Sequence, residues 1–336
     1  MRAAVVSNDP TRTALSVADW PDPTARQGWA LVRLKRAALN RLDAMMLQDR
    51  AELPGPSIFG SDGAGVVAGL GVGVRGPQLD DEVLISPSLR WGAQPEAPGE
   101  HFEILGSPTH GTHAEMVVVP VENLAPKPSR LTWDEAAALP LSGVTAWRAL
   151  VTRGRLKPGE TVIVAAASSG VGTSAIQIAA AIGARVVAIS SSEEKLELAR
   201  SIGAVATVLR NGADFARNLA AATPGGADLA LDPTGALWQP LLQAVRPGGR
   251  LVAVGKMASE TGTVRVQTVY WKQVDILGSS MGSPLDFAAF LEHVQKSSWT
   301  PVIDSVVPLE KIHAAYERLD APDRVGKVVL DTSRSL

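Results

Sequence analysis

The chain has 336 residues, of which 46% are hydrophobic and 20% are charged, and its 32 basic and 34 acidic residues leave a net charge of −2. This composition excludes a disordered chain, and it lacks the basic excess that nucleic-acid-binding proteins carry. The sequence contains no cysteine, which excludes disulfides, thiol nucleophiles and every cysteine-ligated metal site. The length suggests two domains of about 150 residues each.

Residues 1–130 are predicted to form short strands joined by Gly/Pro turns. The strand-like segments are Ala30–Leu34, Glu82–Ile85 and Ala114–Val119. Between Ser86 and Gly111 lies a long connection rich in Pro, Gly and polar residues. Irregular connections of this length usually have a function or mark a remnant of a subdomain.

From Thr161 onward the pattern alternates between strands and helices. Alternation with elements of this length predicts a parallel, doubly wound α/β sheet. The predicted strands are Thr161–Ala167, Arg185–Ser190, Ala204–Leu209, Ala227–Leu231, Gly249–Val254 and Val274–Gly278. The predicted helices and final strand are Thr173–Ile182, Glu193–Ile202, Pro284–Gln295, Leu309–Leu319 and Lys327–Leu330.

The stretch Thr161–Ala184 carries no charge and is long enough to span a bilayer. The turn Ser168–Gly172 interrupts it and alanine dominates it, so a strand, a turn and a buried helix are the better interpretation. The N-terminal apolar run, Ala3–Val6, is too short for a secretory signal. We therefore expect a soluble cytoplasmic protein with no membrane or nucleic-acid partner.

The turn between the strand Thr161–Ala167 and the following helix is the sharpest motif. A dinucleotide site needs a tight turn there, so that amides at the helix N-terminus face the pyrophosphate. Compared with G-x-G-x-x-G, Ala167 and Ser169 replace the first two glycines and Gly172 is retained. An ordinary strand-to-helix turn is the alternative interpretation. The predicted phosphate-binding residues are Ser168, Ser169, Gly170, Val171 and Gly172.

Further motifs along the whole chain resemble the medium-chain dehydrogenase/reductase superfamily, in its zinc-free quinone oxidoreductase-like or zinc-type alcohol dehydrogenase-like branch. The motifs that carry the resemblance are Ala38–Asp43, Phe59–Val67, Gly111–Glu115, Leu139–Trp147, Leu277–Gly282 and Val325–Leu330. The resemblance implies a GroES-like distorted β-barrel domain, residues 1–126 and 283–336, and a Rossmann domain, residues 127–282. The nicotinamide is then expected in the cleft between the two domains.

The resemblance also bears on metal binding. In zinc-dependent members a Cys, a His and a second Cys hold the catalytic metal, and the matching positions here are Asn40, Ser61 and Leu141. The loop in which a structural zinc lobe would fall, Ser86–Gly111, contains no cysteine. The pair His110 and His113 is interpreted as part of a solvated loop. No metal is therefore expected.

The end of the second strand of the Rossmann domain predicts NADP(H) as the cofactor. Ser190, Ser191 and Lys195 stand where an NAD site would place a carboxylate, and hydroxyls and an ammonium suit a 2′-phosphate. Arg210, at the end of the third strand, is expected to reach the adenine end. The alternative is that Ser191 and Glu194 only form a capping box for the helix Glu193–Ile202.

The resemblance assigns further residues to the cofactor. Lys327 is a candidate for the pyrophosphate, with a solvent-facing lysine as the alternative. Ser142 and Thr145 are expected near the nicotinamide. The full additional set is Ser142, Thr145, Gly255, Ser279, Met281 and Lys327.

Two residues are candidates for the chemistry. Asn40 occupies the position of the first metal ligand, and its amide can donate to a carbonyl or quinone oxygen in place of zinc. Asp43 can orient Asn40 or bind a ribose hydroxyl, with a helix N-terminal carboxylate as the alternative. Trp91 is a candidate wall of the substrate cleft, with core packing as the alternative. Ala44–Met46 lacks the tyrosine of quinone reductases, so no protein acid is evident and water is a candidate donor of the final proton.

The sequence therefore predicts a zinc-independent, NADPH-dependent oxidoreductase that transfers hydride to a quinone or an α,β-unsaturated carbonyl, with simple ketones and aldehydes as further candidates. The rival hypothesis is a non-catalytic NADPH-binding protein resembling crystallins or sensors. The segment Gln273–Gly278 holds one charged residue and resembles an edge strand through which two copies pair, so a homodimer is expected.

Overall fold

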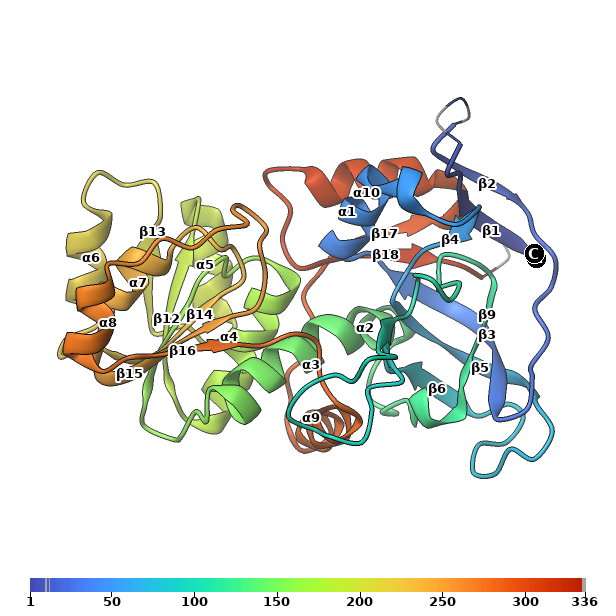
Figure 1. Cartoon of the computed structure of the whole chain (residues 1–336), viewed down its shortest axis with the longest axis horizontal. Coiled ribbons are helices and arrows are strands. Elements are labelled where there is room, and N and C mark those ends of the chain that lie inside the picture. The colour runs from blue at the N-terminus through green and yellow to red at the C-terminus, as the bar shows by residue number, and fades with distance from the viewer. Residues whose placement is uncertain (10, 12, 334–336) are drawn as a thin grey trace. The chain divides into compact units, whose positions relative to one another are not determined.

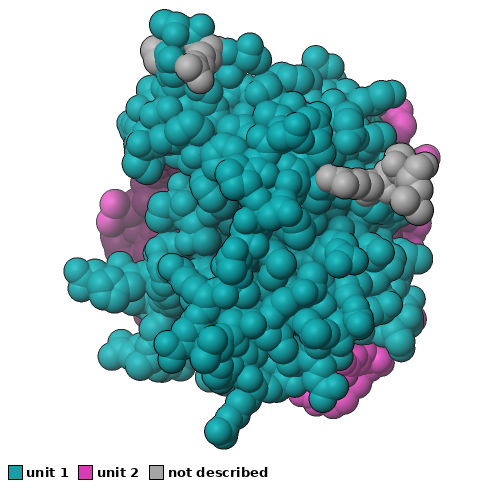
Figure 2. All heavy atoms as spheres, turned by 90° about the vertical axis from the view of Figure 1, so that its right-hand side faces the viewer, with its two compact units in different colours: residues 1–141, 283–291, 300–336 teal, residues 142–282, 292–299 magenta. Residues whose placement is uncertain are grey.

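In the computed structural model, residues 1–9, 11 and 13–333 are described. The chain divides into two compact units, which Figure 2 colours separately. Unit 1 comprises residues 1–141, 283–291 and 300–336, and unit 2 comprises residues 142–282 and 292–299. Within the described ranges, no helix combines the length and the apolar character needed to cross a bilayer.

These bounds differ from the predicted domains in two places. Helix α2 (Trp133–Ala138) packs against β3 (Trp29–Ala38) and β5 (Asp62–Leu70), which assigns residues 127–141 to unit 1. The last residues of α9 (Pro284–Lys296) group with unit 2, where the rings of His293 and Trp147 lie 5.1 Å apart.

Unit 1 is built mainly from antiparallel strands. Its largest sheet has seven strands in the order β10-β6-β5-β3-β18-β17, with β9 paired to β3 (Figure 1). The strands not yet given are β6 (Glu82–Ile85), β9 (Met116–Pro120), β10 (Leu124–Pro126), β17 (Ile303–Pro308) and β18 (Lys327–Asp331). A smaller sheet, β2-β1-β4, comprises β1 (Arg2–Val6), β2 (Leu15–Asp19) and β4 (Ser57–Ile58).

The two larger apolar cores of unit 1 lie on different sheets. One lies inside the large sheet, where alternate residues of its strands, such as Val32, Leu34 and Val67, are buried together. The other packs the small sheet and β18 against α10 (Ile312–Asp320), with Ala44 of α1 (Arg41–Gln48) at its margin. The segment predicted as a loop, Ser86–Gly111, is mostly irregular and contains the short pair β7 (Ser88–Leu89) and β8 (Glu103–Ile104).

Unit 2 holds a six-stranded sheet in the order β13-β12-β11-β14-β15-β16, in which every neighbouring pair is parallel. Numbered along the chain, this is the 3-2-1-4-5-6 order of the Rossmann fold. The predicted α/β sheet is therefore confirmed. The strands are β11 (Thr161–Val164), β12 (Arg185–Ser190), β13 (Ala206–Leu209), β14 (Ala227–Asp232), β15 (Val245–Ala253) and β16 (Asp275–Gly278).

Helices connect and cover these strands. Helix α4 (Gly170–Ile182) packs on β11 and β12, α5 (Glu193–Ser201) on β12 and β13, and α7 (Trp238–Ala244) on β14 and β15 (Figure 1). The remaining helices are α3 (Pro140–Trp147), which continues into a π-helical turn (Arg148–Arg153), α6 (Phe215–Ala222) and α8 (Val266–Lys272). The uncharged stretch Thr161–Ala184 thus forms a strand, a turn and a buried helix, as predicted.

Candidate functional site

The Asp62 carboxylate joins three segments of unit 1. It is fully buried, its Oδ1 accepts the backbone N–H of Leu141 at 2.7 Å, and its Oδ2 accepts from Asn40 Nδ2 at 3.0 Å. The same Oδ2 accepts from Lys327 Nζ at 2.7 Å. Two of the three positions at which zinc-dependent members carry metal ligands, 40 and 141, are therefore linked through Asp62, and Ser61 precedes it in the chain.

The Asn40 amide has a defined orientation because a lysine can only donate. Lys327 Nζ lies 2.5 Å from Asn40 Oδ1, which fixes that atom as the oxygen and leaves Nδ2 to donate to Asp62. Asn40 precedes α1 and is buried. Its side chain is thus engaged with a carboxylate and an ammonium, which the sequence did not indicate.

Asp43 lies in the first turn of α1, and its Oδ2 accepts the Asn40 backbone N–H at 2.7 Å. This contact is the helix N-terminal role of Asp43, while the predicted orienting of the Asn40 side chain by Asp43 stays a prediction. Burial raises the pKa of the Asp43 carboxyl from 3.8 to about 7, although the Asn40 backbone N–H and the charge of Lys327 lower it. A carboxyl with this pKa exchanges a proton near neutrality.

The burial of His113 shows that its interpretation as a solvated loop residue is wrong. It is 1% exposed, its Nε2 lies 4.0 Å from Asp43 Oδ2, and its ring stacks edge-on against Tyr316 of α10. Burial lowers the pKa of His113 to about 3, so this imidazole is neutral, and it raises the pKa of the Tyr316 hydroxyl. His110, by contrast, is exposed and its Nδ1 accepts the Ile58 N–H.

Several buried polar atoms around this cluster lack a hydrogen-bond partner among the described residues. They are Asp43 Oδ1, Ser61 Oγ, both ring nitrogens of His113 and the Tyr316 hydroxyl. Buried polar groups are nearly always satisfied, and exceptions mark a water, an ion or a functional site. Sequence reasoning missed the place of Asp62, His113 and Tyr316 in this cluster. The positions of Asp62 in the Phe59–Val67 motif and of His113 in the Gly111–Glu115 motif offered a signal.

The residues present do not fit a catalytic zinc. Leucine offers no ligand atom, an amide and a hydroxyl are poor substitutes for thiolate and imidazole, and an ammonium occupies the cluster. No group of three or more His, Asp or Glu side chains suited to a metal is found in the described part of the chain.

In unit 2, the predicted phosphate loop connects β11 to α4. Ser169 is the N-cap of α4, and its Oγ accepts the Gly172 N–H at 3.0 Å. A Cβ on Gly172 would lie 2.3 Å from the carbonyl oxygen of Ala166, whose φ of +48° closes the turn tightly. The helix begins beside the point where the strand order reverses, between β11 and β14, which is where ligands of such sheets bind.

The predicted 2′-phosphate residues Ser190, Ser191 and Lys195 lie at the end of β12 and in the turn and first helical residues that follow it. Ser190 is the last residue of β12, and its carbonyl accepts the Arg210 N–H at 2.8 Å. The predicted capping box is wrong: the N-cap is Ser192, whose Oγ accepts the Lys195 N–H at 3.5 Å. The exposed Ser191 hydroxyl is therefore not the cap of α5.

The remaining predicted cofactor residues of unit 2 differ in their burial and hydrogen bonding. Thr145 Oγ1 and Ser279 Oγ are buried without a hydrogen-bond partner among the described residues, as a ligand site would require. Gly255 is exposed, and a Cβ there would lie 2.8 Å from the Pro233 oxygen. Ser142 is buried, and Met281 is buried with a φ of +51°. Their assignment to the cofactor stays a prediction.

Lys327 is placed differently from its prediction. The alternative of a solvent-facing lysine is wrong, because its side chain is 5% exposed. Its ammonium, assigned from the sequence to the pyrophosphate, donates in unit 1 to Asn40 and Asp62. Strand β18 carries it there by pairing with β3, whose end leads into Asn40.

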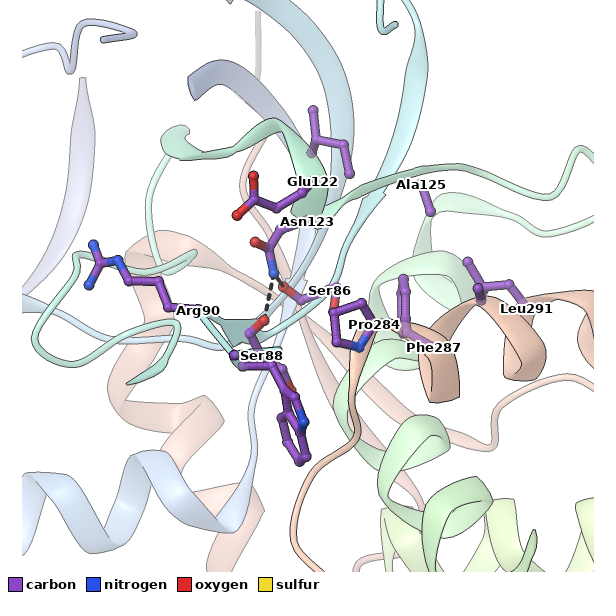
Figure 3. A pocket seen from close by; sticks show the side chains of 13 residues that line it. Ser86, Ser88, Arg90, Glu122, Asn123, Ala125, Pro284, Phe287 and Leu291 are labelled. Atoms are coloured by element: carbon purple, nitrogen blue, oxygen red, sulfur yellow. Dashed lines mark hydrogen bonds between the residues drawn. The ribbon is translucent and has the colours of Figure 1, made fainter. Parts of the chain in front are cut away.

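Unit 1 also has a pocket of about 260 Å³ between the Ser86–Gly92 segment and the start of α9. Trp91 and Phe287 are among its apolar lining residues. Figure 3 shows Asn123 beside Ser86 and Ser88, whose carbonyls accept from its Nδ2 at 3.0 and 2.8 Å. Trp91 is 2% exposed and stacks edge-on against Phe102, so it packs in the core of unit 1. It also forms part of the wall of this pocket.

Comparison with known proteins agrees with this architecture. Residues 26–129 match the alcohol dehydrogenase GroES-like domain, which confirms the predicted GroES-like fold, and residues 170–296 match the zinc-binding dehydrogenases. A zinc-type alcohol dehydrogenase-like protein of Schizosaccharomyces pombe is 31% identical over 90% of both chains. An acryloyl-coenzyme A reductase of Metallosphaera sedula is 29% identical over 99% of this chain and 100% of the relative.

A solved structure described as a NAD-dependent alcohol dehydrogenase superposes with a TM-score of 0.92. It is 39% identical and covers 99% of this chain and 100% of its own. The quinone oxidoreductase branch is not specifically supported by these relatives and stays a prediction. The chain belongs to the medium-chain dehydrogenase/reductase superfamily, as a zinc-type alcohol dehydrogenase-like oxidoreductase.

Proposed function

We propose that the protein is a zinc-independent, NADPH-dependent reductase of α,β-unsaturated carbonyl compounds. The observation that carries the proposal is the Asn40–Asp62–Lys327 cluster, in which an amide stands at one metal-ligand position and Asp62 links it to a second, Leu141. A relative of nearly equal length is named for the reduction of an enoyl thioester. Quinones, which the sequence also suggested, share the conjugated carbonyl and are included as substrates.

The cofactor site is proposed in unit 2. The amides that begin α4 would hold the pyrophosphate, and the Thr145 and Ser279 hydroxyls would receive hydrogen bonds that they lack in the described residues. Ser190, Ser191 and Lys195 would bind the 2′-phosphate of NADPH, and Arg210 would reach its adenine end. When bound, the reduced nicotinamide supplies a hydride.

The residues of unit 1 would act on the substrate. Hydride addition to the β-carbon of an enone shifts charge onto the carbonyl oxygen, and hydrogen-bond donors at that oxygen stabilise the charge. The buried Asn40–Asp62–Lys327 cluster would provide such donors and exclude water from them. The α-carbon then takes its proton from water.

Oxidation of NADPH with a panel of acceptors tests this function. We expect turnover with enones, enoyl thioesters such as crotonyl-CoA, and quinones, in protein treated with a chelator. Binding of NADPH without turnover of any acceptor would instead support the non-catalytic hypothesis.

Alcohol and aldehyde interconversion with NAD(H) is the second candidate. The structure with a TM-score of 0.92 is described as a NAD-dependent alcohol dehydrogenase, which favours this candidate. The same panel separates the two candidates when it includes simple aldehydes, alcohols and both cofactors. Faster turnover of alcohols with NAD⁺ than of enones with NADPH would replace the proposed function.

A further inference from the structure

Unit 1 has a further pocket, which shares no residue with the Asn40–Asp62–Lys327 cluster. Its volume is about 230 Å³. Most of its lining comes from residues 20–29, which end in the first residue of β3, from residues 109–111 and from residues 116–118 of β9. All of these residues belong to unit 1, so the pocket is complete within one unit.

Two tryptophans give this pocket aromatic walls. Trp20 and Trp29 both line it, and both are half-buried. The ring of Trp20 meets the ring of His110 edge-on, with 5.4 Å between the centroids. Neither indole N–H has a hydrogen-bond partner in the described ranges, and neither nitrogen is fully buried. The walls therefore combine apolar ring surface with N–H groups that can still donate.

A tight turn places a cation on the wall. The Arg26 carbonyl accepts the Trp29 N–H at 2.9 Å, and Gly28 has a φ of +75° within this turn. The guanidinium carbon of Arg26 consequently lies 3.7 Å from the centroid of the Trp29 ring. A guanidinium that stacks on an aromatic face keeps its N–H groups free for a second partner. Among residues 1–9, 11 and 13–333, no carboxylate pairs with Arg26.

The polar side chains of the pocket favour an anion. His110 Nδ1 accepts the Ile58 N–H at 3.3 Å, so the proton of the imidazole is on Nε2, which is a donor. No Asp or Glu is among the described residues that line the pocket. Arg26 is therefore a cation without an acidic neighbour in the lining, and it stands beside apolar rings.

We propose that this pocket binds an aromatic carboxylate, whose ring packs against Trp20 and Trp29 and whose carboxylate accepts hydrogen bonds from the Arg26 guanidinium. Transfer of the ring from water to the apolar walls stabilises the complex. The planar fork of a guanidinium matches the two oxygens of a carboxylate. The volume is below that of sites for drug-sized ligands, so one or two rings fit. This site goes beyond the proposed reductase function and does not depend on it.

Calorimetry with a charged and a neutral probe of the same shape tests the proposal. 2-Naphthoate, 2-naphthamide and the smaller benzoate are titrated into the protein with NADP⁺ present, so that the proposed cofactor site is filled. We expect 2-naphthoate to bind at least about tenfold more tightly than 2-naphthamide, because only the carboxylate forms a charge-assisted pair with Arg26.

Two variants separate the charge from the apolar walls. Arg26→Gln should weaken 2-naphthoate binding by about tenfold to a hundredfold and change 2-naphthamide binding by less than about twofold. Arg75→Gln is the matched control, because it removes another exposed arginine of unit 1 that does not line the pocket. It should bind both probes as the wild type does. Thermal unfolding verifies that each variant is folded.

Nuclear magnetic resonance of the indole N–H groups locates the bound probe. The chain has eight tryptophans, and the variants Trp20→Phe and Trp29→Phe identify the signals of these two. We expect 2-naphthoate to shift the Trp20 and Trp29 signals more than the other six in the wild type. Arg26→Gln should require more probe for the same shift.

Three results would overturn the proposal, whether or not the protein reduces enones. Equal affinity for 2-naphthoate and 2-naphthamide would show an apolar pocket without recognition of the carboxylate. Binding that Arg26→Gln leaves unchanged, or that shifts only other indole signals, would place the probe elsewhere. Absence of binding of both 2-naphthoate and benzoate at millimolar concentration would exclude the site.

Discussion

At the scale of single residues, Gly172 determines how closely α4 approaches β11. A Cβ at this position would lie 2.3 Å from the Ala166 carbonyl oxygen, a distance that real Cβ atoms essentially never show. The turn cannot relax easily, because Ala166 already has a φ of +48° and Ser169 caps the helix through the Gly172 N–H. The chain therefore needs glycine here for packing, independent of charge.

We predict that Gly172→Val abolishes binding of both NADPH and NADH, because the phosphate loop must open to admit the side chain. Gly212→Val is the matched control, since a Cβ there meets its nearest neighbour at an ordinary 3.6 Å. Fluorescence titration with both cofactors measures the effect. Normal NADPH binding by Gly172→Val would mean that the loop is not the phosphate site.

Lys195 tests cofactor selectivity. Because its ammonium is proposed to neutralise the 2′-phosphate, Lys195→Ala should weaken NADPH binding by about 1–3 kcal/mol, the range of a charge-assisted hydrogen bond, and leave NADH binding nearly unchanged. Lys157→Ala, which removes an exposed lysine of unit 2, is the control. Calorimetry with both cofactors measures the two affinities. Equal losses of NADPH and NADH affinity would show that Lys195 does not contact the 2′-phosphate.

Asp43 links the site to the pH dependence of stability. Its pKa is about 7 in the folded chain and near 3.8 when unfolded, so the folded state binds its proton more tightly. The stability that this proton provides is fully present below pH 3.8 and is lost as the pH rises to about 7. Asp304 is the opposite case, since its hydrogen bonds with Arg318 help to lower its pKa.

We therefore predict that Asp43→Asn stabilises the protein more at pH 8 than at pH 5, by about 3 kcal/mol between the two conditions, which is roughly two pKa units. Asp304→Asn should change stability equally at both pH values, because its carboxyl is ionised at both. Urea unfolding provides the measurement. A pH-independent effect of Asp43→Asn would show that burial does not hold its proton.

At the scale of elements, the six strands of unit 2 and its helices α4 and α5 were predictable from apolar runs separated by turn residues. The predicted strand Arg185–Ser190 matches β12, and the helix predicted from Glu193 begins there. Strand β17 was missed, because Ile303–Pro308 mixes an acid, a serine and a proline, and its pairing partner β18 lies further along the chain. Short strands of mixed composition form through their pairing partner, which a local pattern does not contain.

The candidate site was predictable only in part, for a related reason. Asn40 and Asp43 lie within one motif and were found together, but the contact between Lys327 and Asp62 spans 265 residues. Only the pairing of β18 with β3 brings Lys327 to that place. The burial of His113 likewise depends on Tyr316, which α10 contributes from the far end of the sequence.

The ligand positions and the loop around β7 and β8 lead to a prediction about metal content. Since Asn40, Ser61 and Leu141 cannot form a zinc site, and the Ser86–Gly111 loop has no cysteine, we expect no stoichiometric zinc in the purified protein. Activity should also survive a chelator. Elemental analysis measures the metal, and about one zinc per chain would refute the prediction.

At the scale of the whole molecule, the edge of the six-stranded sheet determines how copies would associate. Strand β16 forms one edge, where its outer backbone groups can pair with another strand. The neighbouring α8 exposes Val266, Tyr270 and Trp271 at 70%, 60% and 79%. Exposed apolar side chains beside an open edge are typical of an interface.

We predict that the protein is a homodimer in which two β16 strands pair into one continuous sheet. Leu277→Lys places a charge on this edge and should shift the protein toward the monomer, because charged side chains on edge strands oppose pairing. Val306→Lys is the control: it adds the same charge to β17, the edge strand of the unit 1 sheet, and should leave the dimer intact. Light scattering at micromolar concentration measures the mass of each protein. A monomeric wild type would exclude the dimer, and a Leu277→Lys protein that stays dimeric would move the interface away from β16.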